Sequence, residues 1–414
     1  MLVYDPAQQN QPLGEQMKSV AKRTFFAGAG IAAASVLMLS GSLTGSLAQP
    51  PATVVAPPAV AISREPLELD PSKWVGCHRV TGGTLCAPSI QTGTPEIQAK
   101  LRAQMAAAQA AGVTAPVPPS PPAPMVCGTP MKPVNGQPTV RPPQGGRGPI
   151  RVLFITKGHE FEREQLLGML DCLGDDITYA HAEHPAADVL MNPQNSKNFD
   201  VFVFYDLGGP GVLQLGPKGE RNRFYPDPSP ELKTGFEALL KEGKGMVFLH
   251  HAAAAWTHVW PEYAEVVGGA CDWYAPVTVR GILDPHHGYY PRTAQRQTVM
   301  DKSHPISAGL GDSFDMVDEA YGCAWFPESV KPILTTSFTP PDVRVNLNPK
   351  RQYSNLSAWV KVSENSPVFY TQIGHDNNAW RVPAYQTLIR NAIKWAASPE
   401  AHAWAKANRT RIFK

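Results

Sequence analysis

The sequence predicts a mostly parallel, doubly wound α/β domain over residues 149–400, with helices on both faces of the sheet and a β-rich extension. Apolar runs at residues 151–156, 199–205 and 245–250 have the length and composition of strands that are buried on both faces. Helical patterns lie between these runs, and such an alternation produces parallel strands joined by right-handed crossovers. Roughly 250 residues of this kind bury enough surface for a stable core without a metal or a partner.

Each further element has its own local signal. The helical pattern at residues 229–242 begins behind proline and serine and ends at Gly243. Several short β-type runs at residues 277–330 predict the antiparallel extension over one end of the sheet. The remaining predicted elements are a helix at 164–173, a strand at 177–182, a strand at 366–371 and an amphipathic helix at 385–397.

The beginning of the chain has the pattern of an export signal. Lys22 and Arg23 precede a mostly apolar run at residues 25–39, and the small residues around Ala48 suit a signal peptidase. Residues 1–48 are therefore predicted to direct the protein to the periplasm or out of the cell. The alternative is an uncleaved membrane anchor, which would be the protein's only contact with a membrane.

The segments that flank the domain are not predicted to form a core of their own. Residues 49–148 are dense in proline, alanine and glycine, a composition typical of a largely disordered linker. A short helix is expected within it at residues 95–112. Residues 401–414 are expected to form a C-terminal tail.

The net charge and the cysteine content indicate which partners and which cellular compartment to expect. The formal net charge is +2, too small for the one-signed field with which proteins attract nucleic acid, so nucleic acid is not an expected partner. Six cysteines fit an oxidising compartment. Cys77 and Cys86 are the preferred disulfide, closing a small loop. Cys172 lies in an apolar helical pattern and, if unpaired, is a core residue rather than a nucleophile. Cys127, Cys271 and Cys323 have no assigned partners.

Histidines and carboxylates follow the predicted strands. His159, Asp206, His250 and His375 each come at the end of a different strand. In open parallel sheets ligands bind beyond the carboxyl ends of the strands, so these groups are expected to meet at one edge. His250 and His375 are the leading catalytic candidates, with His159 and Asp206 behind them.

Four segments then resemble one family, in order and spacing. Residues 243–250 combine Gly-Lys-Gly with a strand that ends at His250, and residues 304–306 read His-Pro-Ile. Residues 318–321 read Asp-Glu-Ala-Tyr, and a strand at 366–375 ends in Gly-His. Together they resemble the trehalose-utilisation (ThuA-like) family over residues 151–397. That resemblance implies a class I glutamine amidotransferase-like, flavodoxin-like fold and a link to trehalose or related disaccharides, through 3-keto sugars.

Glutaminase chemistry is not expected despite the implied fold. Amidotransferases carry a nucleophilic cysteine at the sharp turn after the corresponding strand. Here that turn reads Leu249-His250-His251-Ala252 and has no nucleophile for a thioester. Histidine instead suits proton transfer near neutral pH, from the carbon beside a keto group or to a leaving oxygen. Glu319 of the Asp-Glu pair is a further candidate, as a base or as a residue that orients an imidazole.

The remaining candidates concern metal and sugar binding. A divalent metal is an option, with His250, His375, Glu319 and His159 as the ligand types, although no short ligand motif supports it. His286 and His287 are assigned to an exposed loop rather than to a metal site. Flat aromatic faces and nearby polar groups suit a sugar ring. The substrate-binding candidates are Trp256, Trp273, Trp325, Asp318, Tyr321 and Trp380.

The sequence therefore predicts an exported protein of carbohydrate metabolism. Its expected partner is a small carbohydrate, a trehalose-type disaccharide or the 3-keto derivative, handled by His and carboxylate acid–base chemistry. Hydrolase, lyase and isomerase are all compatible with these residues. Two alternatives stay open: a non-catalytic carbohydrate-binding module of the cell envelope, and a metal-dependent hydrolase of another substrate. The sequence does not indicate an oligomeric state.

Overall fold

A computed structural model describes most of the chain beyond residue 147. The described residues are 77–86, five single positions between 99 and 110, 148–215, 221–275, 277–280, 282–284, 288–340 and 354–413. The five single positions are helical, as predicted for that segment. The expected export signal, most of the linker and the His286-His287 pair lie outside the described residues. Within the described residues, no helix is both long and apolar enough to cross a membrane.

A nine-stranded sheet forms the centre of the domain, in the order β13-β12-β15-β16-β17-β8-β5-β3-β4. Five of its strands pair in parallel, which confirms that part of the prediction, but the other four are antiparallel, so the sheet is mixed rather than mostly parallel. The five parallel strands are β3 (Ile150–Lys157), β4 (Ile177–Glu183), β5 (Val201–Asp206), β8 (Gly245–Leu249) and β17 (Ser366–Thr371).

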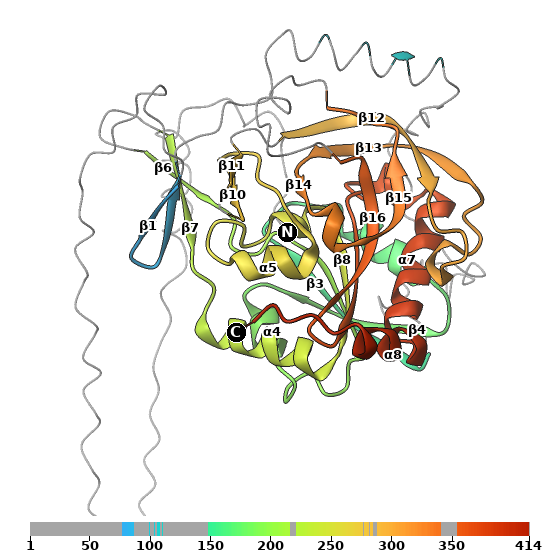
Figure 1. Ribbon diagram of the computed structural model, residues 1–414, viewed down its shortest axis with the longest axis horizontal. Coiled ribbons are helices and arrows are strands. Elements are labelled where there is room, and N and C mark those ends of the chain that lie inside the picture. Colours follow the sequence, from blue (N-terminus) through green and yellow to red (C-terminus); the bar gives the residue numbers. More distant parts are fainter. Residues whose placement is uncertain are drawn as a thin grey trace, which may run out of the picture. The chain divides into compact units, whose positions relative to one another are not determined.

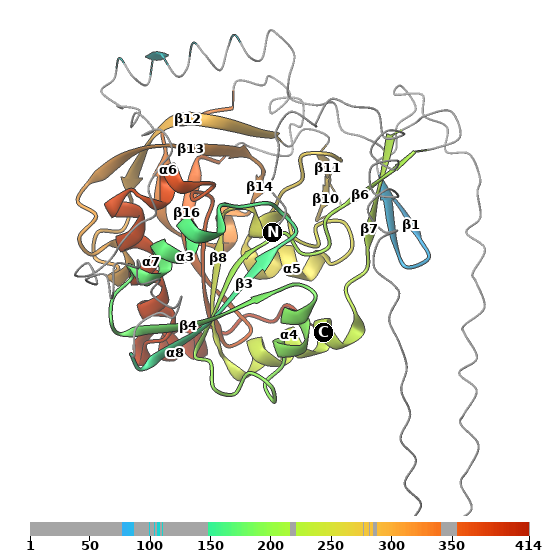
Figure 2. The ribbon, with the colours of Figure 1, turned by 180° about the vertical axis from the view of Figure 1, so that it is seen from behind.

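The other half of the sheet is antiparallel and continues from β17. Its strands are β12 (Gly288–Val299), β13 (Ser313–Gly322), β15 (Lys331–Thr336) and β16 (Leu356–Ser363). The β-type runs at residues 277–330 thus extend the central sheet itself through β12 and β13. The long β12 and β13 lie side by side in both ribbon views (Figure 1, Figure 2).

Helices cover both faces of the parallel strands. Helices α3 (Arg163–Asp171), α6 (Asn377–Trp380), α7 (Pro383–Ala396) and α8 (Pro399–Ala407) pack on one face. Helices α4 (Pro230–Glu242) and α5 (Pro261–Val267) pack on the other. Figure 1 shows α4 and α5 across the strands from α7 and α8. Successive strand residues point to opposite faces, so continuous apolar strands supply both layers of the core.

The alternation is visible in β3 and α4. Leu153 packs toward α4 and α5, whereas Phe154 packs toward α3 and α7, and both are fully buried. Helix α4 begins where predicted because Ser229 accepts a hydrogen bond from the Leu232 amide at 3.0 Å. It ends at Gly243, whose φ of 94° is one that glycine adopts without strain.

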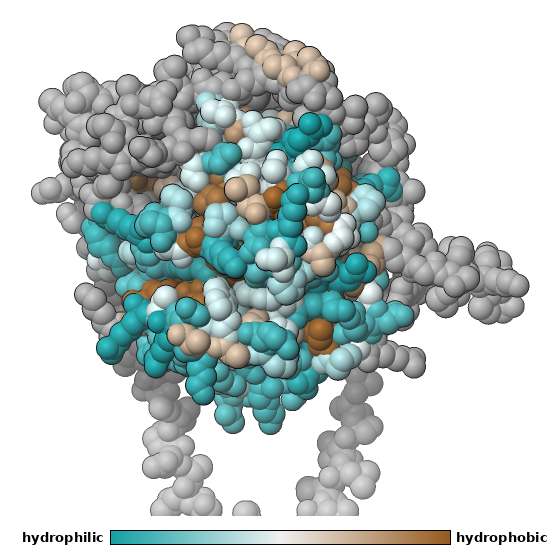
Figure 3. Space-filling model, turned by 45° about the vertical axis from the view of Figure 1, so that its right-hand side comes forward, coloured by the Kyte–Doolittle hydropathy of each residue, from teal (hydrophilic) through white to brown (hydrophobic). Residues whose placement is uncertain are grey.

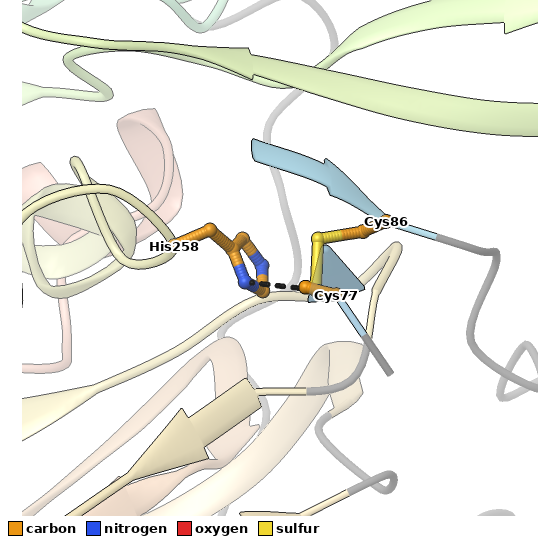
Figure 4. A group of neighbouring side chains, drawn as sticks. All are labelled: Cys77, Cys86 and His258. Atoms are coloured by element: carbon orange, nitrogen blue, oxygen red, sulfur yellow. Dashed lines mark hydrogen bonds between the residues drawn. A yellow bond between two sulfur atoms is a disulfide. The ribbon is translucent and has the colours of Figure 1, made fainter. Parts of the chain in front are cut away.

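A smaller four-stranded sheet contains the N-terminal hairpin. Its order is β1 (Cys77–Val80), β2 (Gly83–Cys86), β7 (Arg221–Pro226) and β6 (Val212–Leu215). The predicted disulfide between Cys77 and Cys86 is confirmed, and Figure 4 shows the imidazole of His258 beside it. The Nδ1 atom of His258 lies 3.4 Å from the Cys77 sulfur. The hairpin is therefore fixed both by strand pairing and by this contact.

The other described cysteines are oxidised too. Cys271 and Cys323 form a disulfide that joins the segment after β9 (Gly269–Ala270) to the segment before β14 (Ala324–Trp325). Cys172 is also disulfide-bonded, so its expected role as an unpaired core residue does not apply. Two short strands, β10 (Val277–Val279) and β11 (Ile282–Asp284), form a separate hairpin.

The domain extends past the expected boundary at residue 400. That boundary falls inside α8, whose Ala401 and Ala405 are buried against the sheet. The following residues are held by the buried carboxylate of Glu364, which accepts hydrogen bonds from the amides of Ile412 and Phe413. Residues 401–413 therefore pack on the domain instead of forming a separate tail, because they contact residues such as Glu364 that are distant in the sequence.

The exposed surface is mostly polar. Figure 3 shows one face of the molecule, on which hydrophilic residues predominate and apolar residues form small scattered patches. Among the described residues, the large apolar side chains that are exposed are Val189, Val212, Leu213, Tyr274, Tyr289 and Met300. One of these, Tyr289, contacts the ring of Trp273.

Candidate functional site

His250 occupies the turn directly after β8 and has an unusual backbone. Its φ of 52° lies in the left-handed region, which costs energy for a residue other than glycine and is typical of functional turns. The side chain is completely buried. Its Nδ1 lies 2.7 Å from the carbonyl oxygen of Gln372, which only accepts, so Nδ1 carries a proton. The neutral imidazole therefore directs the lone pair of Nε2 into the site.

Two further predicted residues meet that Nε2 atom. Glu319 comes from β13, and His375 follows β17 and Gly374. The Nε2 of His250 lies 3.0 Å from Nδ1 of His375 and 3.2 Å from Oε2 of Glu319. The same Oε2 lies 3.3 Å from Nδ1 of His375. The two imidazoles therefore share one site with Glu319, and we call these three residues the His-Glu-His centre.

Charge is distributed unevenly in the His-Glu-His centre. Burial would lower the pKa of His375, but the hydrogen bond and charge of Glu319 raise it to about 9. Burial lowers the pKa of His250, against the opposing effect of Glu319. For Glu319, burial on its own raises the pKa, yet its contacts with the imidazoles of His250 and His375 lower it overall. The centre thus holds an ionised carboxylate beside one charged and one neutral imidazole.

The loop that carries His375 is held rigidly from both sides. The carboxylate of Asp318 accepts hydrogen bonds from the amides of Gly374 at 2.5 Å and His375 at 3.0 Å. The same carboxylate accepts from the Glu319 amide at 2.9 Å. The hydroxyl of Tyr205 donates to the His375 carbonyl oxygen at 2.7 Å. Asp318 is only 3 % exposed, so the expectation that it contacts substrate is wrong: it positions two members of the centre.

His159 lies next to the centre and is exposed. Its ring centroid is 5.8 Å from that of His375 and 5.0 Å from that of His251. Its Nδ1 lies 2.6 Å from the carbonyl oxygen of Glu160 and therefore carries a proton. The Nε2 atom of His159 therefore carries a lone pair, and this atom has no hydrogen bond to any of the described residues. Burial lowers the pKa of His159, which leaves it neutral near pH 7.

His251 closes the inner side of this group. It is buried, and its Nδ1 lies 3.1 Å from the carbonyl oxygen of Asp206. Burial places its pKa well below the ordinary value. The ring lies 4.4 Å from that of Tyr205, centroid to centroid. His251 therefore forms a neutral wall behind His159 rather than a fourth member of the centre.

Asp206 belongs to a second polar cluster on the same edge. Its Oδ2 lies 2.9 Å from Nε2 of His184, whose Nδ1 lies 2.5 Å from Asp188. Asp206 is thus engaged by His184 instead of by His250 or His375. His184 was not among the candidates, although it follows β4 directly and the same strand-end rule selects it. Burial would lower the pKa of His184, but the two carboxylates raise it to about 10.

This raised pKa makes a prediction for stability. The stabilisation that His184 supplies is complete below about pH 6.5, its ordinary pKa, and is lost as the pH rises through about 10. Replacing His184 with glutamine is expected to destabilise the protein by roughly 2–4 kcal/mol at pH 6 and by much less near pH 10. Urea unfolding of both proteins across this range measures the difference. A difference that does not change with pH would contradict the assignment.

The aromatic candidates separate into two groups. Trp380 is fully buried with its Nε1 on the Gly374 carbonyl oxygen, and Trp325 is 7 % exposed and packs on Trp359. Neither can face a sugar, so these two assignments are wrong. Both belong to the core because the rings fill space between the sheet and its covering segments.

The other group lies beside the centre. Tyr321 is buried and its ring stacks on His250 at 4.7 Å, with its hydroxyl 2.6 Å from Nε2. Trp273 contacts Tyr321, at 5.2 Å between centroids, and Tyr289, at 6.0 Å. Tyr289 is 40 % exposed and was not among the candidates. This row of rings leads from the centre to the surface.

Trp256 lies on the other side, near His184. Its ring packs on the backbone of Gly208 and Gly209, where an added Cβ would lie 2.4 Å and 2.3 Å from ring atoms. Its centroid is 6.4 Å from that of His184. The half-buried ring therefore remains a candidate for contact with a substrate, and the two glycines explain how it approaches this edge.

Comparison with known proteins gives one family match. The family model described as "ThuA: Trehalose utilisation" matches residues 151–396. No curated protein matches the chain. Among solved structures, a putative ThuA-like protein from Parabacteroides merdae is similar, with 17% identity, a TM-score of 0.45 and coverage of 60% of this chain and 90% of that one.

Two further structures are similar at lower scores. A putative ThuA-like protein from Bacteroides uniformis has 18% identity and a TM-score of 0.41, with 61% and 93% of the two chains covered. A glutamine amidotransferase from Thermotoga maritima has 12% identity and a TM-score of 0.32, with 61% and 100% covered.

Proposed function

Because the chain belongs to the ThuA family of trehalose utilisation, we propose that it acts on trehalose-type disaccharides or their 3-keto derivatives. One observation carries the proposal: His250, Glu319 and His375 come from three distant segments and meet within 3.3 Å at the carboxyl edge of the sheet. Polar groups that converge at this edge are typical of a small-molecule site. The pattern at residues 17–48 supports the further proposal that the protein is exported.

The proposed chemistry begins with removal of the proton from the carbon beside a keto group. This step is common to isomerisation of a keto sugar and to elimination of its glycosidic oxygen. His159 has a free Nε2 lone pair at the exposed side of the centre and is the proposed base. The charged imidazole of His375, beside His159, is the proposed hydrogen-bond donor to the keto oxygen, on which negative charge develops.

The aromatic row supplies a surface for the sugar. Tyr289 is exposed, Trp273 contacts it edge-on, and Tyr321 links both rings to His250. Ring faces of this kind pack on the apolar faces of pyranose rings. In the proposed pose the second sugar ring lies along Tyr289 while the keto ring lies at the centre.

The test is proton exchange on 3-keto-trehalose in D2O, followed by NMR at the carbon beside the keto group. The wild-type protein is expected to accelerate exchange. His375→Ala, which removes the donor to the keto oxygen, His250→Ala, which removes its neighbour in the centre, and His159→Gln, which removes the base, are each expected to slow it by about 10²–10⁴-fold. His402→Gln is the matched control, since His402 lies at the opposite edge of the strands near Gly243 and Asp200.

Other outcomes identify the alternatives. Sugar binding without exchange, unaffected in all three variants, would indicate a carbohydrate-binding module. No binding of any trehalose-type sugar would contradict the proposed substrate class and favour a hydrolase of another substrate. Unfolding curves of each variant show whether a slow variant is simply unfolded.

A further inference from the structure

We propose that the His-Glu-His centre binds one divalent transition-metal ion through Nε2 of His250, Oε2 of Glu319 and Nδ1 of His375. The ion's part in catalysis rests on the proposed function, whereas its binding does not. Two imidazoles and one carboxylate are ligands that such ions accept. Within the part of the chain that the structure describes, this is one of two groups whose ligand atoms lie close enough for a shared ion.

The distances match those of a coordination sphere. The three ligand atoms are 3.0, 3.2 and 3.3 Å apart. An ion with bonds of about 2.0–2.1 Å separates neighbouring ligands by about 2.9 Å in an octahedron and about 3.4 Å in a tetrahedron. The observed triangle falls between these values. One ion above its plane can therefore reach all three atoms without movement of the backbone.

The protonation of His250 also favours a cation. Its Nδ1 proton is directed to the Gln372 carbonyl oxygen, so Nε2 presents a lone pair toward the Glu319 carboxylate. Two such groups repel unless positive charge lies between them. Nδ1 of His375 supplies that charge when it carries a proton, and the Tyr321 hydroxyl donates to Nε2 of His250 at 2.6 Å. A divalent ion that replaces this proton contacts all three ligand atoms at once. The hydrogen bond from Nδ1 of His250 to a backbone carbonyl is also the usual support of a histidine that binds metal.

The surroundings hold the ligands in place before any ion binds. The backbone of His375 is fixed at its amide by Asp318 and at its carbonyl by Tyr205. Asp318 fixes the Glu319 amide as well. Ligands held in this way lose little freedom on binding, which favours high affinity. The carboxylate gives the triad one negative charge, which attracts a dication.

The site has one open side. The side chains of His250 and Glu319 are 0% and 8% exposed, whereas that of His375 is 30% exposed. The remaining coordination positions therefore face His159 and the solvent. A keto sugar offers two neighbouring oxygens there, the keto oxygen and the adjacent hydroxyl, which can bind one ion together. This deepens the proposed function, because the ion would hold the oxygen beside the carbon that His159 deprotonates.

The second group, Cys77, Cys86 and His258, does not compete in the oxidised protein. Its sulfurs are joined in a disulfide and are not thiolates, the form that binds metal (Figure 4). Of the two groups found in the described part of the chain, metal measurements made without reductant therefore report the His-Glu-His centre.

The experiment is a titration of untagged, chelator-treated protein with Co²⁺, followed by visible absorption, and with Zn²⁺, followed by calorimetry. One ion per chain is expected. Glu319→Gln and His375→Gln are each expected to weaken binding at least about ten-fold. His159→Gln and His402→Gln are expected to bind as wild type does, because neither residue is a ligand. His250→Ala serves as a third variant where its unfolding curve shows a folded protein.

The possible outcomes distinguish the proposed metal site from the proposed function. Absence of Co²⁺ and Zn²⁺ binding, or binding equal in Glu319→Gln, His375→Gln and wild type, overturns the metal site. Proton exchange on the keto sugar that persists at full rate in the metal-free protein overturns the ion's part in catalysis and leaves the proposed function. Metal binding without any exchange overturns the proposed function and leaves the metal site.

Discussion

Glu319→Gln is expected to lower kcat/KM on the keto sugar by about 10²–10⁴-fold. Glu319 is the only anion of the His-Glu-His centre, and its Oε2 contacts both imidazoles. Glutamine keeps the size of the side chain but removes the charge that supports two histidines. Steady-state kinetics on 3-keto-trehalose measures the loss.

The same variant has a second readout in the chelator-treated protein. Glu319 raises the pKa of His375 to about 9, so its neutral replacement is expected to lower that pKa by about one to three pH units. NMR titration of the His375 ring follows this change directly. Glu400→Gln, in the exposed first turn of α8, is the control and is expected to change neither quantity. An unchanged His375 titration in Glu319→Gln would contradict the arrangement of the centre.

Asp318→Ala is expected to destabilise the protein by roughly 3–5 kcal/mol. Its carboxylate accepts hydrogen bonds from the buried amides of Glu319 and Gly374 and from the part-buried amide of His375. Alanine leaves these three donors without an acceptor, and each unpaired buried donor costs about 1–3 kcal/mol. Urea unfolding measures the change. Asp315→Ala, on the same strand but in a partly exposed pair with Arg296, is the control and should cost less than about 1 kcal/mol.

Asp318→Asn separates positioning from folding. Asparagine keeps one acceptor oxygen for two of the three amides, while its NH₂ group faces the third donor. The variant should therefore fold with a smaller loss of stability and hold His375 less firmly. Because Asp318 is buried and acts through the backbone of Glu319 and His375, kcat is expected to fall while KM changes little. A variant with wild-type kcat would show that the loop needs no support from Asp318.

Local patterns in the sequence were enough to predict the parallel half of the fold. The apolar runs and helix signals between residues 150 and 250 correspond to β3, α4, β5 and β8 with small shifts at their ends. These elements are predictable because their periodicity reflects burial on one or two faces, and burial follows from the residues themselves. The strand-end rule then brought His250 and His375 to one edge, and the Asp-Glu pair supplied Glu319.

The predictions that failed depend on which way a side chain points. Asp318 and Glu319 are adjacent on β13, so they face opposite sides of the strand. Asp318 holds the loop of His375, whereas Glu319 enters the site. Both are carboxylates, so the residue types do not show which of them has which role. Trp325 and Trp380 were placed near substrate for their rings, but both fill the core. The strand-end rule could have selected His184, but its pairing with Asp206 becomes visible only once β4 and β5 are placed on either side of β3.

The sequence by itself determined the α/β class, the Cys77–Cys86 pair, the family and the edge of the sheet at which chemistry is expected. Only the tertiary structure decided that the antiparallel strands continue the same sheet and that residues 401–413 pack on the domain. It also decided that three ligand-type atoms lie within 3.3 Å of one another. The reason is physical: hydrophobic periodicity is written in neighbouring residues, whereas the contact of β8, β13 and β17 joins residues up to 125 positions apart.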